Sequence, residues 1–156
     1  MLTDSDILII VAKQIYEDYM TFGSSQHTEE GRDFYEWGNL SDLSKTPFLV
    51  QAERLIDQLS SIGWIITDKG KGEPFIISEE ETEKLAKIEH EYWMEDRLKE
   101  GWTSASERNV GKKETPYFIP YEDLSEEIKE LDRVRVRQIP KVLERAGLYV
   151  LYSKQL

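Results

Sequence analysis

The chain has 156 residues, of which 39% are hydrophobic and 11% aromatic, and it carries a net charge of −11 and no cysteine. This length fits one ordinary domain, and the apolar content is enough for a packed core. The lack of cysteine excludes disulfides, thiolate metal sites and a nucleophilic Cys. The negative charge argues against direct nucleic-acid binding, and no apolar run is long enough to span a bilayer. We therefore expect a single cytoplasmic domain, 1–156, without a secretion signal or a membrane partner.

The N-terminal segment predicts one helix followed by a long loop. Thr3 and Asp6 have the spacing of a capping box, so a helix should begin directly after Thr3 and end near Met20. Residues 21–39 contain Gly-Ser-Ser and little hydrophobic periodicity, which is typical of an irregular connection.

A second helix and a β-hairpin should follow. Thr46 before Pro47 is typical of an N-cap and the first helical position, and Gly63 is a typical helix end. The segments WIIT (64–67) and FIIS (75–78) are apolar and flank a glycine-rich stretch. This pattern predicts the two strands of a hairpin.

The next helix carries a sequence that begins like a zinc-protease motif. Ser78 and Glu81 form a capping box for a helix over about 79–99. Within it, HEYWM starts as H-E-x-x-H at His90, but Met94 stands where the second His is required. Because the chain lacks paired His residues, we expect neither a metal site nor a cofactor.

The last helix should be interrupted near its middle. Asp123, with Glu126 three residues later, predicts its cap, and Pro140 should kink or split it before it ends at Gly147. The apolar segment LYVLYS (148–153) should pair with the earlier hairpin.

Two internal matches predict that the chain contains two copies of one unit. AKQIYEDYM (12–20) matches AKIEHEYWM (86–94) at an offset of 74 residues. Residues 34–64 match 118–148 at an offset of 84 with seven identities, where chance gives about two. The fold class should be mainly α with a small antiparallel β element, built from tandem pseudo-two-fold helix-loop-helix-strand repeats. The copies span 4–66 and 81–151, joined by a linker or hairpin at 67–80.

Aromatic residues occupy equivalent helix faces in the two copies. His90, Trp93 and Arg97 follow i, i+3, i+7 spacing, and Tyr16 and Tyr19 hold the corresponding positions of the first copy. If the copies pack about a pseudo-two-fold axis, Tyr19 and Trp93 could sandwich a planar ligand. The alternative is that both rings pack in a core between the copies.

The second copy resembles the ryanodine-receptor repeat, or RyR domain, over about 85–150. The shared motifs are His-x-x-Trp with Arg four residues later, Gly-Trp at the helix end, a Pro-x-x-x-Pro-Tyr segment and Leu-Asp-Arg. The family usually continues Gly-Trp with Thr-Tyr-Gly-Pro, whereas residues 103–106 read Thr-Ser-Ala-Ser. By this resemblance the first copy is degenerate, with Tyr16 and Tyr19 in place of His and Trp, and the protein is similar to the bacterial or phage standalone type.

The resemblance implies a mainly α fold with two pseudo-symmetric halves. Such domains occur in the cytosolic part of calcium-release channels and as standalone or fused modules in bacteria and phages. A tandem pair in the channels can hold an adenine nucleotide between aromatic residues that correspond to Tyr19 and Trp93. The bacterial forms are suspected nucleotide sensors, and the family is not known for catalysis. The resemblance therefore implies a ligand sensor rather than an enzyme.

The expected ligand site gathers aromatic and basic residues. Tyr19 and Trp93 would stack a base, and His90 or Tyr16 would bond its edge. Residues 83–156 carry 14 basic residues against six in 1–82, so an anionic ligand should lie nearer the second half. The residues expected to meet its phosphate are Arg97, Arg108, Lys112 and Lys113.

Other residues of the second copy are expected to serve packing. Trp102 should pack the helix end, while Tyr121, Asp132 and Arg133 should hold the last helix on the preceding loop. The arginines of that helix face many acids and are not expected to form a binding patch; they are Arg133, Arg135 and Arg137.

Three functions are compatible with these patterns. The first is a non-catalytic sensor that binds a nucleotide or a nucleotide-derived molecule between aromatic residues of the two repeats. The second is a protein-interaction or assembly module, in which the acidic first repeat binds a basic partner protein. The third is an acidic DNA mimic, although the acidic residues are scattered among Lys and Arg.

Overall fold

The computed structural model describes residues 2–22, 35–70 and 75–153. These residues are mainly helical with a small antiparallel sheet, as predicted. The chain divides into two compact units: unit 1 is 1–76 with 139–156, and unit 2 is 77–138. None of the described helices is both long and apolar enough to cross a membrane.

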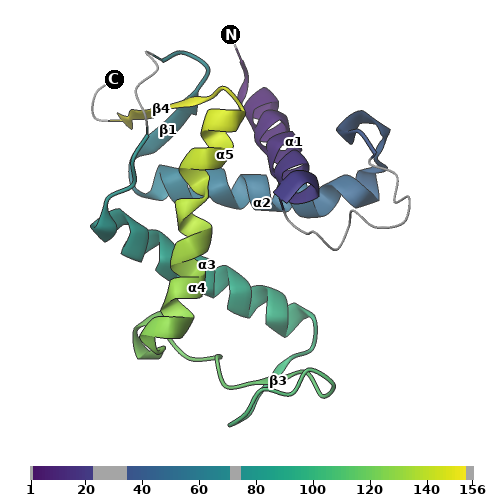
Figure 1. The fold of residues 1–156 in the computed structure, drawn as a ribbon, viewed down its shortest axis with the longest axis vertical. Helices are drawn as coiled ribbons and strands as arrows, with labels where there is room; N and C mark the ends of the chain where they lie inside the picture. Colours follow the sequence, from purple (N-terminus) through teal and green to yellow (C-terminus); the bar gives the residue numbers. More distant parts are fainter. Residues whose placement is uncertain (1, 23–34, 71–74, 154–156) are drawn as a thin grey trace. The chain divides into compact units, whose positions relative to one another are not determined.

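Each unit has its own set of elements (Figure 1). Unit 1 contains α1 (Asp4–Phe22), η2 (Trp37–Asn39), α2 (Asp42–Ser61), β1 (Trp64–Thr67), α5 (Ile139–Arg145) and β4 (Tyr149–Tyr152). Unit 2 contains α3 (Glu79–Lys99), β2 (Thr103–Ser104), β3 (Glu114–Thr115), η3 (Tyr121–Asp123) and α4 (Glu126–Arg137).

In unit 1, α1 packs against α2 and α5 around a small apolar core. Val11, Ala12 and Leu59 are completely buried there. The predicted capping box of α1 is confirmed, because the Asp6 amide donates to Thr3 Oγ1 at 3.1 Å and the Thr3 amide donates to Asp6 Oδ2 at 2.9 Å. The helix starts where the sequence indicates and ends two residues beyond the predicted Met20.

The predicted hairpin between 64–67 and 75–78 is wrong, since only its first segment is a strand. β1 instead pairs antiparallel with β4, with Trp64 opposite Tyr152, so the predicted role of the last apolar segment is confirmed. The chain leaves β1 along β4: a Cβ on Gly70 would lie 2.2 Å from Cγ of Tyr149. The close approach to this ring explains why a glycine follows the strand without forming a tight turn.

Two predicted helix caps also lie elsewhere. Ser41, not Thr46, caps α2, which begins five residues earlier and contains Pro47 in its second turn. Ser125, not Asp123, caps α4, because Asp123 belongs to the preceding η3. Ser, Thr and Asp are all good N-caps, so local preference alone does not choose among neighbouring candidates.

Unit 2 is an α-hairpin with a long structured connection. The capping box of α3 by Ser78 and Glu81 and its end at Lys99 match the prediction. α3 packs against α4, and the connection contains the short parallel pair β2–β3, which the sequence does not predict. The predicted interruption near Pro140 is confirmed, because α4 ends at Arg137 and α5 begins at Ile139.

Equivalent features of the two units recur at the offset of 84 residues that the sequence match suggests. η2 starts at Trp37 and η3 at Tyr121, and the following caps are Ser41 and Ser125. α2 runs from 42 to 61, while α4 begins at 126 and α5 ends at 145. These coincidences support the predicted duplication.

Replacement of the two candidate caps of α4 tests its observed start. We expect Ser125→Ala to lower the free energy of unfolding by about 1 kcal/mol, because the amide of Ile128 loses its partner. Asp123→Ala should change it by less than about 0.5 kcal/mol, as typical surface substitutions do. Urea denaturation of both variants measures the difference, and an equal or larger effect of Asp123→Ala would contradict the assignment.

Candidate functional site

A cavity of about 360 Å³ lies within unit 2, bounded by α3, α4 and the connection between them. Its volume is within the usual range for small-molecule sites, at the low end. α3 contributes His90, Trp93 and Arg97, which confirms that these three residues share one helix face. The connection contributes Trp102 and Arg108, among others.

The aromatic wall of the cavity is centred on Trp93. The His90 ring stacks on it with 5.7 Å between centroids and 10° between planes, and Phe118 lies 5.8 Å away. The Arg97 guanidinium is 6.0 Å from the centre of the indole ring. Trp93 is thus held by neighbours of its own unit yet remains partly exposed to the cavity, where a flat ligand could pack on it.

His90 fixes the connection to α3. Its side chain is buried, and Nε2 lies 2.8 Å from the main-chain carbonyl oxygen of Ile119. A carbonyl only accepts hydrogen bonds, so Nε2 must carry a proton and donate it. The other ring nitrogen, Nδ1, faces the Asp132 carboxylate at 3.7 Å.

Asp132 is a buried carboxyl group on the cavity wall. The residue is 5% exposed, and no hydrogen bond from its side chain to the described part of the chain is found. Burial raises the pKa of Asp132 to about 6, against the opposing influence of His90 and Arg135. The prediction that Asp132 holds the last helix on the loop is therefore wrong, because it bonds no loop atom.

That anchoring role belongs to Tyr121 and Arg133, as the sequence predicts for those two. The Tyr121 hydroxyl donates to Glu83 Oε2 at 3.0 Å, and Arg133 pairs with the other oxygen of the same carboxylate. Burial, together with the bond to Glu83, raises the pKa of Tyr121 to about 12. Arg133 also lies 2.9 Å from Glu126. One carboxylate of α3 thus secures both η3 and α4.

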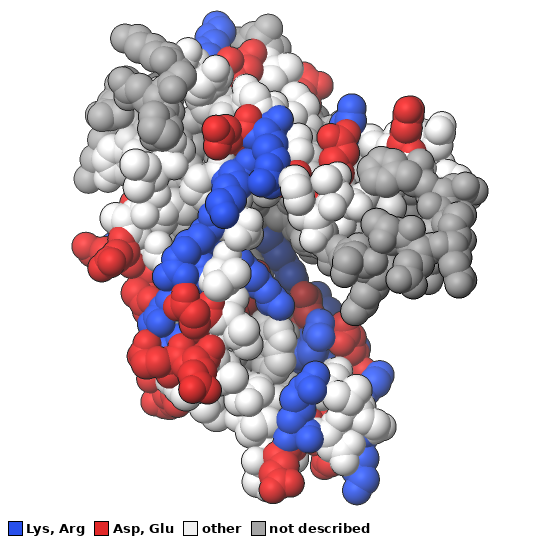
Figure 2. All heavy atoms as spheres, viewed as in Figure 1, with Lys and Arg blue, Asp and Glu red and all other residues white. Residues whose placement is uncertain are grey.

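The arginines of unit 2 separate into paired and unpaired groups. Arg133 and Arg137 form ion pairs with glutamates, and Figure 2 shows acidic side chains gathered near the start of α4. Arg108 and Arg135 line the cavity and have no carboxylate within ion-pair distance among the described residues. Contrary to the sequence-based expectation, Arg135 therefore belongs with the candidate binding residues.

Arg97 is intermediate between these groups. Its Nη2 donates to Glu100 at 3.2 Å, and its Nε lies 3.2 Å from the other oxygen of that carboxylate. The Nε geometry does not make a hydrogen bond, and this buried donor is the one orphaned side-chain nitrogen or oxygen found in the described ranges. A ligand anion at the cavity could satisfy it.

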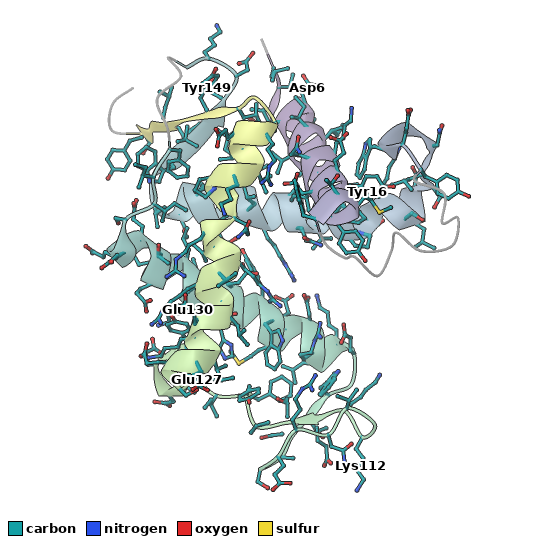
Figure 3. All side chains as sticks on the ribbon, viewed as in Figure 1. Asp6, Tyr16, Lys112, Glu127, Glu130 and Tyr149 are labelled. Carbon is teal, nitrogen blue, oxygen red and sulfur yellow. The ribbon has the colours of Figure 1, made fainter. Side chains whose placement is uncertain are left out.

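The predicted lysines lie outside the cavity lining. Lys113 Nζ donates to the main-chain oxygen of Glu100 at 2.8 Å, and its backbone has a positive φ of 54°. Lys112 is exposed on the connection between β2 and β3, away from α3 and α4 (Figure 3). Neither residue is positioned by this structure to contact a ligand in the cavity.

The predicted aromatic residues of the first copy belong to unit 1. The Tyr16 hydroxyl, on α1, donates to the main-chain oxygen of Tyr35, and burial raises the pKa of Tyr16 (Figure 3). Tyr19 lies 5.9 Å from the Phe48 ring and is 45% exposed. His27 falls outside the described residues, and within them no group of three His, Asp or Glu side chains could hold a metal.

Sequence reasoning missed Trp102, Tyr117 and one face of α4 as parts of the cavity. Ile128, Leu131, Asp132 and Arg135 follow i, i+3, i+4, i+7 spacing, so helical periodicity could have grouped them. It could not have shown that the face borders a cavity, since Leu131 is 61% exposed and Asp132 buried.

A comparison with known protein families places this site inside one match. Residues 78–152 match the family model of the RyR domain. The match starts at the N-cap of α3 and ends with β4, so it contains every residue that lines the cavity.

Replacement of Asp132 should change how stability depends on pH. The folded pKa of about 6 lies above the usual 3.8, so the proton is bound more tightly in the folded state. This stabilising contribution is complete below about pH 3.8 and is lost as the pH rises through about 6. Asp132→Asn should therefore gain stability relative to wild type between pH 4 and 7, by on the order of 2 kcal/mol. Thermal unfolding at several pH values measures it, and a constant difference would contradict the burial effect.

Proposed function

The chain belongs to the RyR domain family through residues 78–152, and on that premise we propose that unit 2 is a non-catalytic ligand-binding sensor module. Its ligand is a small anion with a flat aromatic ring, and nucleotides or nucleotide-derived molecules are the class that combines both features. The binding site is the cavity between α3, α4 and their connection.

The observation that carries the proposal is the unequal pairing of the arginines. In a chain with a net charge of −11, Arg108 and Arg135 line the cavity without a carboxylate partner in the described residues. Unpaired guanidinium groups beside a cavity favour a phosphate or carboxylate, which they bind through paired N–H donors. The half-buried Trp93 on the same wall supplies a surface for an aromatic ring.

The sandwich between the two repeats is a finer part of the proposal. Tyr19 supports it because its ring is 45% exposed, so it retains area on which a ligand could stack. Trp93 would cover one side of the ligand ring and Tyr19 the other. The cavity in unit 2 supports binding whether or not the second ring participates.

Removal of one cavity arginine tests the anion site. We expect Arg135→Gln to weaken binding of nucleoside monophosphates about tenfold or more, because a charge-assisted hydrogen bond is worth roughly 1.5–3 kcal/mol. Arg137→Gln is the matched control on the same helix, since Arg137 pairs with Glu130 and does not line the cavity. Titration calorimetry with a panel of nucleotides measures both variants.

Three results would overturn the proposed function. They are the absence of binding of any nucleotide at millimolar concentration, equal effects of the two arginine variants, and turnover of the bound nucleotide. The first would favour the protein-interaction alternative, in which the aromatic rings serve packing alone.

The sandwich has its own test. If Tyr19 stacks on the ligand, Tyr19→Ala should weaken nucleotide binding by about 1–3 kcal/mol, the usual worth of one aromatic stack. Tyr35→Ala is a suitable control, because Tyr35 is similarly exposed and bonds Tyr16 through its main chain. Unchanged affinity in Tyr19→Ala would restrict the ligand to unit 2.

A further inference from the structure

Asp132 is a feature of the cavity that packing does not explain. It is nine-tenths buried, lines the cavity and has no hydrogen bond from its carboxylate in the described part of the chain. Its one close charged neighbour is His90 Nδ1, at 3.7 Å, beyond hydrogen-bond distance. A buried carboxylate without hydrogen bonds is unfavourable, so such groups in folded proteins usually have a role beyond packing.

The first unit shows that the fold can do without this carboxylate. At the offset of 84 residues, Phe48 takes the place of Asp132, and at the offset of 74, Tyr16 takes the place of His90. Tyr16 and Phe48 pack edge to face at 5.2 Å, an apolar contact where unit 2 has a polar pair. An aromatic pair therefore satisfies the same helix packing, and Asp132 is the choice that requires another explanation.

We infer that Asp132 determines the specificity of the cavity by accepting hydrogen bonds from two adjacent N–H groups on the ring of the ligand. The inference rests on the proposed function, because it assumes that a nucleotide-like molecule occupies the cavity. Among common bases it selects guanine, whose ring N–H and exocyclic amino group lie side by side. Adenine offers one donor beside a ring-nitrogen acceptor, which an ionised carboxylate repels.

The charges around Asp132 suit this assignment. His90 on α3 and Arg135 on α4 favour the ionised carboxylate, while burial and Glu89 on α3 oppose it. With a pKa of about 6, the group is mainly an acceptor at neutral pH and becomes a donor on modest acidification. The nearby arginines remain available for the phosphate, so one cavity supplies both kinds of contact.

His90 acts as a positioning residue in this arrangement. Its Nε2 is engaged by the Ile119 carbonyl and its ring stacks on Trp93, so the imidazole cannot readily turn. The ring consequently holds its Nδ1 edge toward Asp132. The carboxylate is thereby kept on the same wall as the indole that would stack the base.

Calorimetric titration with three monophosphates tests the inference on the full chain at pH 7.5. Guanosine 5′-monophosphate should bind roughly ten- to a hundredfold more tightly than the adenosine compound, the discrimination expected from one bidentate pair. Inosine 5′-monophosphate, which lacks the exocyclic amino group, should fall between them. Asp132→Asn should reduce or reverse the preference, because an amide offers the donor and acceptor that match adenine.

A matched control and a second measurement keep the test decisive. Asp123→Asn, an exposed carboxylate of the same unit, should leave the preference unchanged. If Asp132→Asn does not fold, the wild type serves alone, because lowering the pH from 7.5 to 5 should diminish its preference for guanine. Equal affinities for guanine and adenine compounds, or a preference unaffected by both Asp132→Asn and pH, would overturn the inference while nucleotide binding stands. Failure of all three compounds to bind would overturn the proposed function and this inference together.

Discussion

The hydrogen bond from the buried His90 ring to the main-chain oxygen of Ile119 is the contact on which the cavity depends. It joins the middle of α3 to a point 29 residues later, just before η3. The connection between the helices is long, and such a segment needs fixed points if it is to form one wall of a site. Unit 1 has a corresponding bond from Tyr16 to Tyr35, at the same offsets that relate the two repeats.

Around this fixed point, unit 2 distributes its charges by function. Glu83 of α3 engages both Tyr121 and Arg133, so strong charged contacts lie on the side that secures η3 and α4. The cavity side keeps guanidinium groups without carboxylate partners among the described residues. An arginine side chain next to a free carboxylate would have its donors occupied, so the separation of the two groups is what makes anion binding physically available.

Asp132 shows stability and recognition in opposition. Burial disfavours its ionised form, and unit 1 has an aromatic ring in the corresponding position. Proteins often keep such unfavourable groups at functional sites, where a ligand supplies the missing partner. The same chemistry explains why a degenerate copy could lose the polar pair and retain its helix packing.

The sequence by itself determined the features that depend on neighbouring residues. The capping boxes at Thr3 and Ser78 and the helix end at Gly63 satisfy backbone groups only a few residues away, so their patterns are legible in a short window. Helical spacing likewise placed His90 and Trp93 on one face. The family motifs identified the second copy.

Only the tertiary structure decided which distant segments meet. The pairing of β1 with β4, about 85 residues apart, replaced the local hairpin because the ring of Tyr149 packs where the chain leaves β1. Burial of Asp132 and the lack of a partner for Arg135 were equally invisible, since both depend on what α3 and the connection place beside α4. A carboxylate and a guanidinium on a helix look alike in sequence whether they face water or a cavity, because desolvation is a property of the packed neighbours and not of the residue itself.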